Sequence, residues 1–216
     1  MKLFPTLTGI LVIGVAGVIA QNSATPIRWT EGAPNSTSEV KNDNKIEGLK
    51  TDDVHIFVSM SDLKETEYNR VWVQIANHSK APIDFDPQTA ILLTGKDKTV
   101  RAEMPDKAAK SIERFGEAKS QELSSAHCNQ MGATQCQPTN TQMQMSKQVA
   151  AYSSQQAQWV RDNAFTKKTI APGEEAQGII VFKKEKKPAS YILRVPAGTE
   201  TFEFPLSAQN KMPSYD

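Results

Sequence analysis

Thr169-Ile-Ala-Pro172-Gly173-Glu-Glu-Ala-Gln-Gly178-Ile-Ile-Val-Phe182 is the stretch that decides the fold of this chain. Its Pro172-Gly173 pair is typical of a tight turn, because proline fixes one backbone angle and glycine tolerates the conformation that follows. The β-branched and aromatic residues after the turn predict a buried strand. We expect this strand to be the partner that the other strands of the chain need.

Other strands are predicted from apolar residues that recur at every second position. Val54 to Met60 and Val71 to Ile75 follow this pattern, which places their apolar side chains on one face of an extended chain. Further short strands, separated by turns, are expected near residues 90–93, 99–102, 165–170, 191–195 and 201–206. The predicted fold class is therefore mainly β, an antiparallel sandwich of about seven or eight strands.

Between residues 105 and 164 the apolar spacing changes to that of a helix. Pro105 and Asp106 fit a helix start, and a stripe follows at Ala108, Ile112, Phe115 and Leu123. A second helix is predicted to open at Thr141, whose spacing to Gln144 fits a capping box, with a stripe at Met145, Val149, Tyr152, Gln156 and Trp159. We expect a helical hairpin inserted between two strands and packed on the sheet as a lid. If the sheet cannot cover the whole stripe, Tyr152 and Trp159 become a candidate partner surface.

The ends of the chain are interpreted as segments outside the folded domain. Lys2 and the apolar run from Leu7 to Ala20 indicate a secretory signal peptide over residues 1–20, because the run is shorter than the roughly 20 residues of a membrane-spanning helix. Residues 21–50 are polar and predict a flexible segment. The domain is expected over residues 51–208, with a tail over residues 209–216. The predicted location is secreted or periplasmic, with membrane contact only if the leader stays uncleaved.

The charge balance argues against nucleic acid as a partner, and the two cysteines suggest a disulfide or a metal site. Lys2 is the only charged residue of the leader, so the rest of the chain carries 24 basic and 24 acidic side chains. This balance gives no basic excess for nucleic acid, which is not expected as a partner. Cys128 and Cys136 are the two cysteines, and a close pair in an exported chain favours a disulfide at the tip of the hairpin. Alternatively, thiolate and thioether ligands select cuprous copper, with candidate ligands His127, Cys128, Met131, Cys136 and Met143.

The chain contains no catalytic motif that we recognise. A nucleophile elbow, a zinc-binding helix with paired histidines and a glycine-rich phosphate loop are all missing from the sequence. Asp84 and Asp86 are close together, but two carboxylates are too few for calcium, and a turn explains them better. We expect a non-enzymatic binding module of the cell envelope that needs no cofactor and has an unknown protein or envelope component as its partner. The alternative hypothesis is a periplasmic copper-binding protein that uses the region from His127 to Met145.

Two motifs give the chain a resemblance to a known class of domains. One is Ile170-x-Pro172-Gly173 followed by Gly178 and Phe182, and the other is Val71-x-Val73-x-Ile75-x-Asn77-x-Ser79 with Pro82. Together they resemble the immunoglobulin-like domains of exported bacterial proteins, in which the first motif is the turn before a central strand and the second is a strand ending in an asparagine-containing turn. The resemblance covers about residues 54–102 and 165–207. It implies an immunoglobulin-like sandwich and an exported setting, and it transfers no catalytic or binding residue.

Overall fold

The computed structural model describes residues 25–41, 44–63, 66–95, 98–125, 139–185 and 190–206. The elements within these ranges are, in chain order, β1 (Ile27–Arg28), β2 (Ser36–Lys41), β3 (Asn44–Lys50), β4 (Val54–Asp62), β5 (Tyr68–Asn77), β6 (Ile83–Phe85), a short 3-10 helix (Pro87–Thr89), β7 (Ile91–Thr94), β8 (Thr99–Glu103), α1 (Pro105–Ser125), α3 (Asn140–Asn163), β9 (Lys168–Ile170), β10 (Glu175–Lys183), β11 (Tyr191–Ala197) and β12 (Glu200–Leu206). The predicted mainly β fold with an inserted helical hairpin is confirmed.

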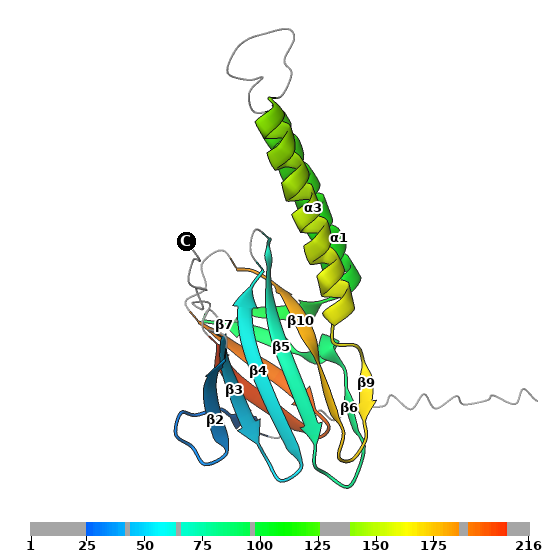
Figure 1. Cartoon of the computed structure of the whole chain (residues 1–216). Helices are drawn as coiled ribbons and strands as arrows, with labels where there is room; N and C mark the ends of the chain where they lie inside the picture. Colours follow the sequence, from blue (N-terminus) through cyan, green and yellow to red (C-terminus); the bar gives the residue numbers. More distant parts are fainter. Residues whose placement is uncertain are drawn as a thin grey trace, which may run out of the picture.

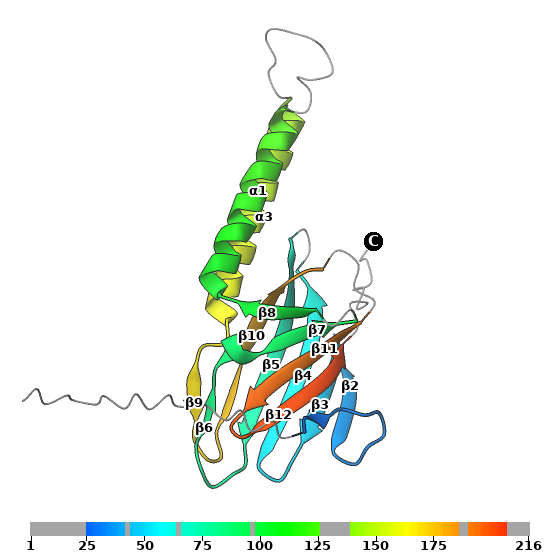
Figure 2. The ribbon, with the colours of Figure 1, turned by 180° about the vertical axis from the view of Figure 1, so that it is seen from behind.

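Ten of the strands form a single curled sheet, in the order β1-β12-β11-β7-β8-β10-β5-β4-β3-β2. The curl gives a half-barrel with two facing layers: β2, β3, β4, β5 and β10 face the viewer in Figure 1, and β7, β11 and β12 do so from behind in Figure 2. Strand β8 makes the corner, because it pairs with β7 in one layer and with β10 in the other. The sheet is larger than the predicted seven or eight strands.

The main hydrophobic core lies between the two layers. Alternate residues of β4 and β5 point into it, and β12 contributes Phe202 and Phe204, both of which are fully buried. Burial of a large apolar side chain contributes roughly 1.5–3 kcal/mol, so this core accounts for much of the stability of the sheet. A separate two-stranded sheet, β6 with β9, covers one end of the core, where the Phe85 and Phe165 rings meet edge to face at 4.6 Å.

The stretch from Thr169 to Phe182 contains β10, which pairs with β5 on one side and β8 on the other. The glycine of its turn, Gly173, has a φ of 79°, which strains a residue with a side chain, and its N–H donates to the Asn77 carbonyl at 2.7 Å. Gly178 lies under the chain that returns from α3, because a Cβ there would be 2.6 Å from Phe165 Cα. The turn and the asparagine-containing strand end predicted from sequence therefore meet in space.

Ile27–Arg28, Ser36–Lys41 and Asn44–Lys50 are strands of the sheet, so the prediction of a flexible segment over residues 21–50 is wrong for them. Strand β1 pairs in parallel with β12 in one layer, whereas β2 and β3 extend the other layer beside β4. Leu49 is fully buried in the core. The sequence does not predict these strands because most of their side chains are exposed and give no apolar pattern. Backbone hydrogen bonds to the neighbouring strands hold the segment in place.

The helical hairpin projects away from the sheet (Figures 1 and 2). Only its base packs on the strands, in a second core of α1, α3 and β10 residues together with Leu63 and Tyr68; its members from the helices are Ala108, Ala109, Ile112, Ala157 and Val160. The predicted lid is therefore wrong: most of the hairpin length lies beyond the sheet. The capping box is also two residues earlier than predicted, at Thr139 and Gln142.

Several predictions concern residues outside the described ranges. These include the signal peptide over residues 1–20, the tail over residues 209–216 and the pairing of Cys128 with Cys136. Within the described ranges, no helix combines the length and the apolar character that a membrane span needs.

Candidate functional site

Three large apolar side chains are exposed along one face of α3. Met145, Tyr152 and Trp159 have 53%, 41% and 36% of their surface exposed. They are seven residues apart, about two helical turns, so they lie on the same face with about 10 Å between successive members. We call these residues the α3 stripe. Val149 and Gln156, which the sequence placed on the same stripe, are half-buried instead.

The face of α3 that meets α1 carries small residues. Ser153 lies against Gly116, and the hydroxyls of Ser120 and Ser146 are hydrogen-bonded at 2.6 Å. Small residues let two helices approach closely, so this contact leaves no room for large side chains. The α3 stripe is therefore directed away from this helix contact.

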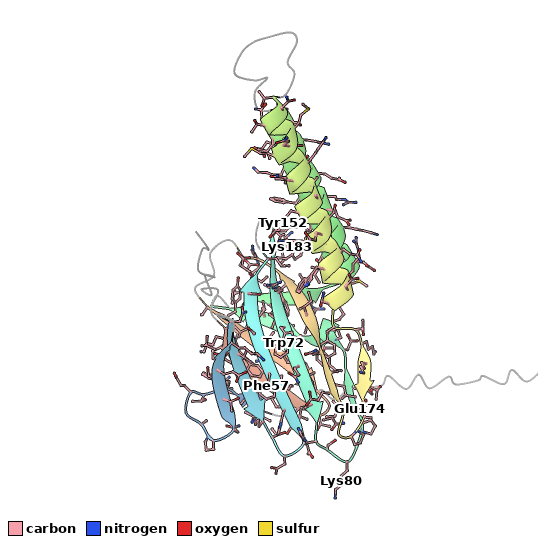
Figure 3. All side chains as sticks on the ribbon, viewed as in Figure 1. Phe57, Trp72, Lys80, Tyr152, Glu174 and Lys183 are labelled. Carbon is pink, nitrogen blue, oxygen red and sulfur yellow. The ribbon has the colours of Figure 1, made fainter. Side chains whose placement is uncertain are left out.

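A groove lies where the stripe reaches the sheet. It has a volume of about 350 Å³ and is lined by Lys41, Asn44, Ile46, Ser59, Ser61, Arg70, Trp72, Trp159 and Ile179. In the view of Figure 3, Tyr152, Trp72 and Phe57 follow one another from the hairpin down the sheet. Trp159 of the α3 stripe and Trp72 of β5 thus line the same groove.

Arg70 lines the groove and contacts Trp159 of the α3 stripe. Its guanidinium lies 4.7 Å from the centre of the Trp159 ring, within reach of a cation–π interaction, and its Nε donates to Ser61 Oγ at 2.6 Å. Burial lowers the pKa of Arg70, and the nearby Tyr152 and Asp62 act in the opposite direction. Arginine loses its proton only far above neutral pH, so Arg70 remains a cation at neutral pH.

The structure places only one of the predicted copper ligands. Met143 is 40% exposed in the first turn of α3, whereas His127, Cys128, Met131 and Cys136 lie outside the described residues. The described ranges hold no cluster of three or more His, Cys, Asp or Glu residues placed to bind a metal ion. Asp84 accepts a hydrogen bond from Thr169 Oγ1, and Asp86 caps the 3-10 helix, as the structural interpretation of this pair predicts.

A larger cavity, which the sequence did not suggest, opens between the two layers beside β3. Its volume is about 470 Å³, and its lining is Trp29, Lys45, Glu47, Met60, Ser190, Tyr191, Ile192, Pro205 and Leu206. Glu47 is only 3% exposed, and its Oε1 accepts a hydrogen bond from Lys45 Nζ at 2.6 Å. Burial raises the pKa of Glu47, and Lys45 acts in the opposite direction.

Sequence reasoning missed this cavity because it treated residues 21–50 as a flexible segment. A signal was nevertheless present: Glu47 and Leu49 occupy alternate positions and share the inner face of β3. A charged residue at a core position interrupts the alternation of apolar and polar residues by which a strand is predicted. Such a residue in a strand can also mark a buried site.

The comparisons with known proteins show no family. No protein-family model matches the chain, and no curated protein matches it in sequence. Among solved structures, the crystal structure of the yjhA protein from Bacillus subtilis is similar, with 11% identity and a TM-score of 0.38. The match covers 84% of this chain and 99% of that one.

Proposed function

We propose that this protein is an exported, non-enzymatic binding module that engages a protein or another envelope component through its helical hairpin. One observation carries the proposal. Of the eight exposed large apolar side chains among the described residues, five belong to the hairpin: Phe115, Met143, Met145, Tyr152 and Trp159. Apolar groups gathered on one projecting element are typical of an interaction surface.

The chemistry of the stripe suits recognition. Tyrosine and tryptophan bury much area at little cost in side-chain freedom, and methionine adapts its shape to a partner. Arg70 adds a cation at the lower end of the stripe, where the groove begins. We expect the partner to present an apolar surface to Tyr152 and Met145 and a hydrogen-bond acceptor or anion near Arg70.

The location and the finer fold class are also proposals. A secreted or periplasmic location rests on the signal-peptide pattern of residues 1–20, with membrane contact if the leader is retained. The immunoglobulin-like class rests on the contact between the Pro172-Gly173 turn and the strand end at Asn77, and the ten-stranded order differs from a simple two-sheet sandwich. The alternative proposal, copper binding between His127 and Met145, rests on ligand types in the sequence alone.

Site-specific photo-crosslinking in the source cells tests the hairpin as a recognition element. A photo-reactive aromatic residue replaces Tyr152 in one variant and Ser154 in the matched control. Both positions are exposed on α3, but Ser154 lies on a different face of the helix. We expect a discrete crosslinked product from position 152 and much less from position 154. Equal products from the two positions, or none from position 152, would contradict the proposal.

A further inference from the structure

Glu47 is a buried carboxylate with only one of its oxygens engaged. Lys45 Nζ donates to Oε1, whereas Oε2 is buried and has no hydrogen-bond partner among the described residues. Buried polar atoms are almost always hydrogen-bonded, and an unpaired oxygen of an ionised group is especially costly. An ionised Glu47 therefore lacks a hydrogen-bond donor at Oε2 within the part of the chain that the structure describes.

Glu203 shows how a second buried carboxylate of this molecule is satisfied. It is also 3% exposed, and each of its oxygens faces a different cation. Arg28 Nε donates to Oε2 at 2.7 Å, and Arg194 Nε donates to Oε1 at 2.9 Å. Among the described residues, Glu47 pairs with one cation, Lys45, whereas Glu203 pairs with two, so a second positive group fits the chemistry of Glu47 Oε2.

The cavity around Glu47 supplies walls for the rest of such a group. Trp29 is fixed at its rim by two hydrogen bonds, from its backbone N–H to the Glu203 carbonyl at 2.8 Å and from Nε1 to the Thr37 carbonyl at 3.0 Å. Lys45 Nζ lies 5.0 Å from the centre of the Trp29 ring, so this ring already attracts an ammonium group. Met60 and Leu206 add apolar surface.

We propose that this cavity binds a small organic ammonium ion, whose N–H groups donate to Glu47 Oε2 and whose apolar part lies against Trp29 and Leu206. The raised pKa of Glu47 agrees with this assignment, because it indicates that Lys45 alone does not compensate for the burial of the carboxylate. The site is separate from the hairpin, so it stands or falls independently of the proposed partner surface.

Isothermal titration calorimetry on the full-length chain tests the site with two probes of equal length, n-butylammonium and 1-butanol. We expect the wild type to bind the ammonium more tightly than the alcohol. Glu47→Gln removes the charge and should weaken ammonium binding about tenfold, the value of a charged hydrogen bond, while alcohol binding changes little. Glu39→Gln, which removes an exposed carboxylate of β2, is the matched control and should change neither.

A second variant gives a change of opposite sign. Lys45→Met removes the cation that competes for Glu47, so ammonium binding should become several-fold tighter. Circular dichroism checks that each variant is folded. If Glu47→Gln is not folded, the affinity of Lys45→Met for the ammonium ion tests the proposal instead. Equal affinity of the wild type for the two probes, or unchanged ammonium binding in the variants, would overturn the proposal and leave Glu47 as a purely structural carboxylate.

Discussion

Two histidine rings in contact lead us to expect that the stability of the fold depends on pH. His55 on β4 and His78, just after β5, have ring centres 4.0 Å apart. Burial lowers the pKa of His55, and the positive charges of His78 and Lys50 lower it further, against a backbone hydrogen bond with Thr51 that raises it. The folded state therefore favours the neutral imidazole.

The sign of the resulting pH effect follows from this shift. Because the unfolded chain takes up the His55 proton at a higher pH than the folded chain, stability is lost as pH falls from about 6.5 through the lowered pKa. We expect His55→Gln to lose less stability than the wild type between about pH 7.5 and pH 5, measured by urea unfolding at several pH values. The raised pKa of Glu47 makes its contribution to stability increase as pH falls, opposite to that of His55. The comparison is therefore the difference in unfolding free energy between His55→Gln and the wild type at each pH. Parallel pH profiles would contradict the account.

The contact between α1 and α3 depends on residues that have almost no side chain. A Cβ on Gly116 would lie 2.2 Å from Ser153 Oγ and 2.3 Å from Ser153 Cβ, so the Ser153 side chain fills the space beside Gly116. Nearer the base, Arg161 donates to both oxygens of Glu113, at 2.9 and 3.1 Å. The hairpin is therefore stabilised by close packing and a two-bond ion pair rather than by large apolar side chains.

Gly116→Ala should loosen the hairpin although alanine favours helices more than glycine does. Overpacking of a tight contact costs about 1–3 kcal/mol. The change from glycine to alanine gains roughly 1 kcal/mol in helix propensity. Because the added Cβ would clash with two atoms of Ser153, we expect a cost near the upper end of the range, which exceeds this gain. We expect faster amide hydrogen exchange in α1 and α3, with exchange in β4 and β5 unchanged. Ser153→Gly removes the clashing atoms, so the double variant should recover part of the protection. Unchanged exchange in the single variant would contradict the close contact.

The elements that sequence predicts well are those whose large side chains point into a core. Strands β4 and β5 alternate in this way, and β10 has a run of buried residues near its end; the structure places all three as predicted. Strand β2 has no buried residue, so no pattern identifies it, and Glu47 conceals the pattern of β3. On the helices, the predicted stripe follows Met145, Tyr152 and Trp159 because they are large, whereas the buried contact uses Gly116 and Ser153. A prediction from large apolar residues therefore identifies the exposed face of α3 instead of the face that packs on α1.

At the scale of the whole molecule, the main core and the exposed α3 stripe belong to different parts of the chain. The half-barrel contains the main core, and the N-terminal segment completes it by pairing with β12 in one layer and β4 in the other. The hairpin contributes only its base to the packing of the sheet and extends the rest into solvent, as Figure 1 shows. The exposed α3 stripe is thus free to change without loss of the core.

The most direct test measures crosslinking after the stripe has been altered. A photo-reactive residue at Gln155, which is exposed beside Tyr152, reports on the partner in the full-length chain, with and without Met145→Ser and Tyr152→Ser. Because exposed positions usually change stability by less than about 0.5 kcal/mol, the altered chain should unfold as the wild type does. We predict that its crosslinked product falls about tenfold, since aromatic anchors dominate binding energy. An undiminished product from a folded variant would contradict the account of the hairpin as the recognition element.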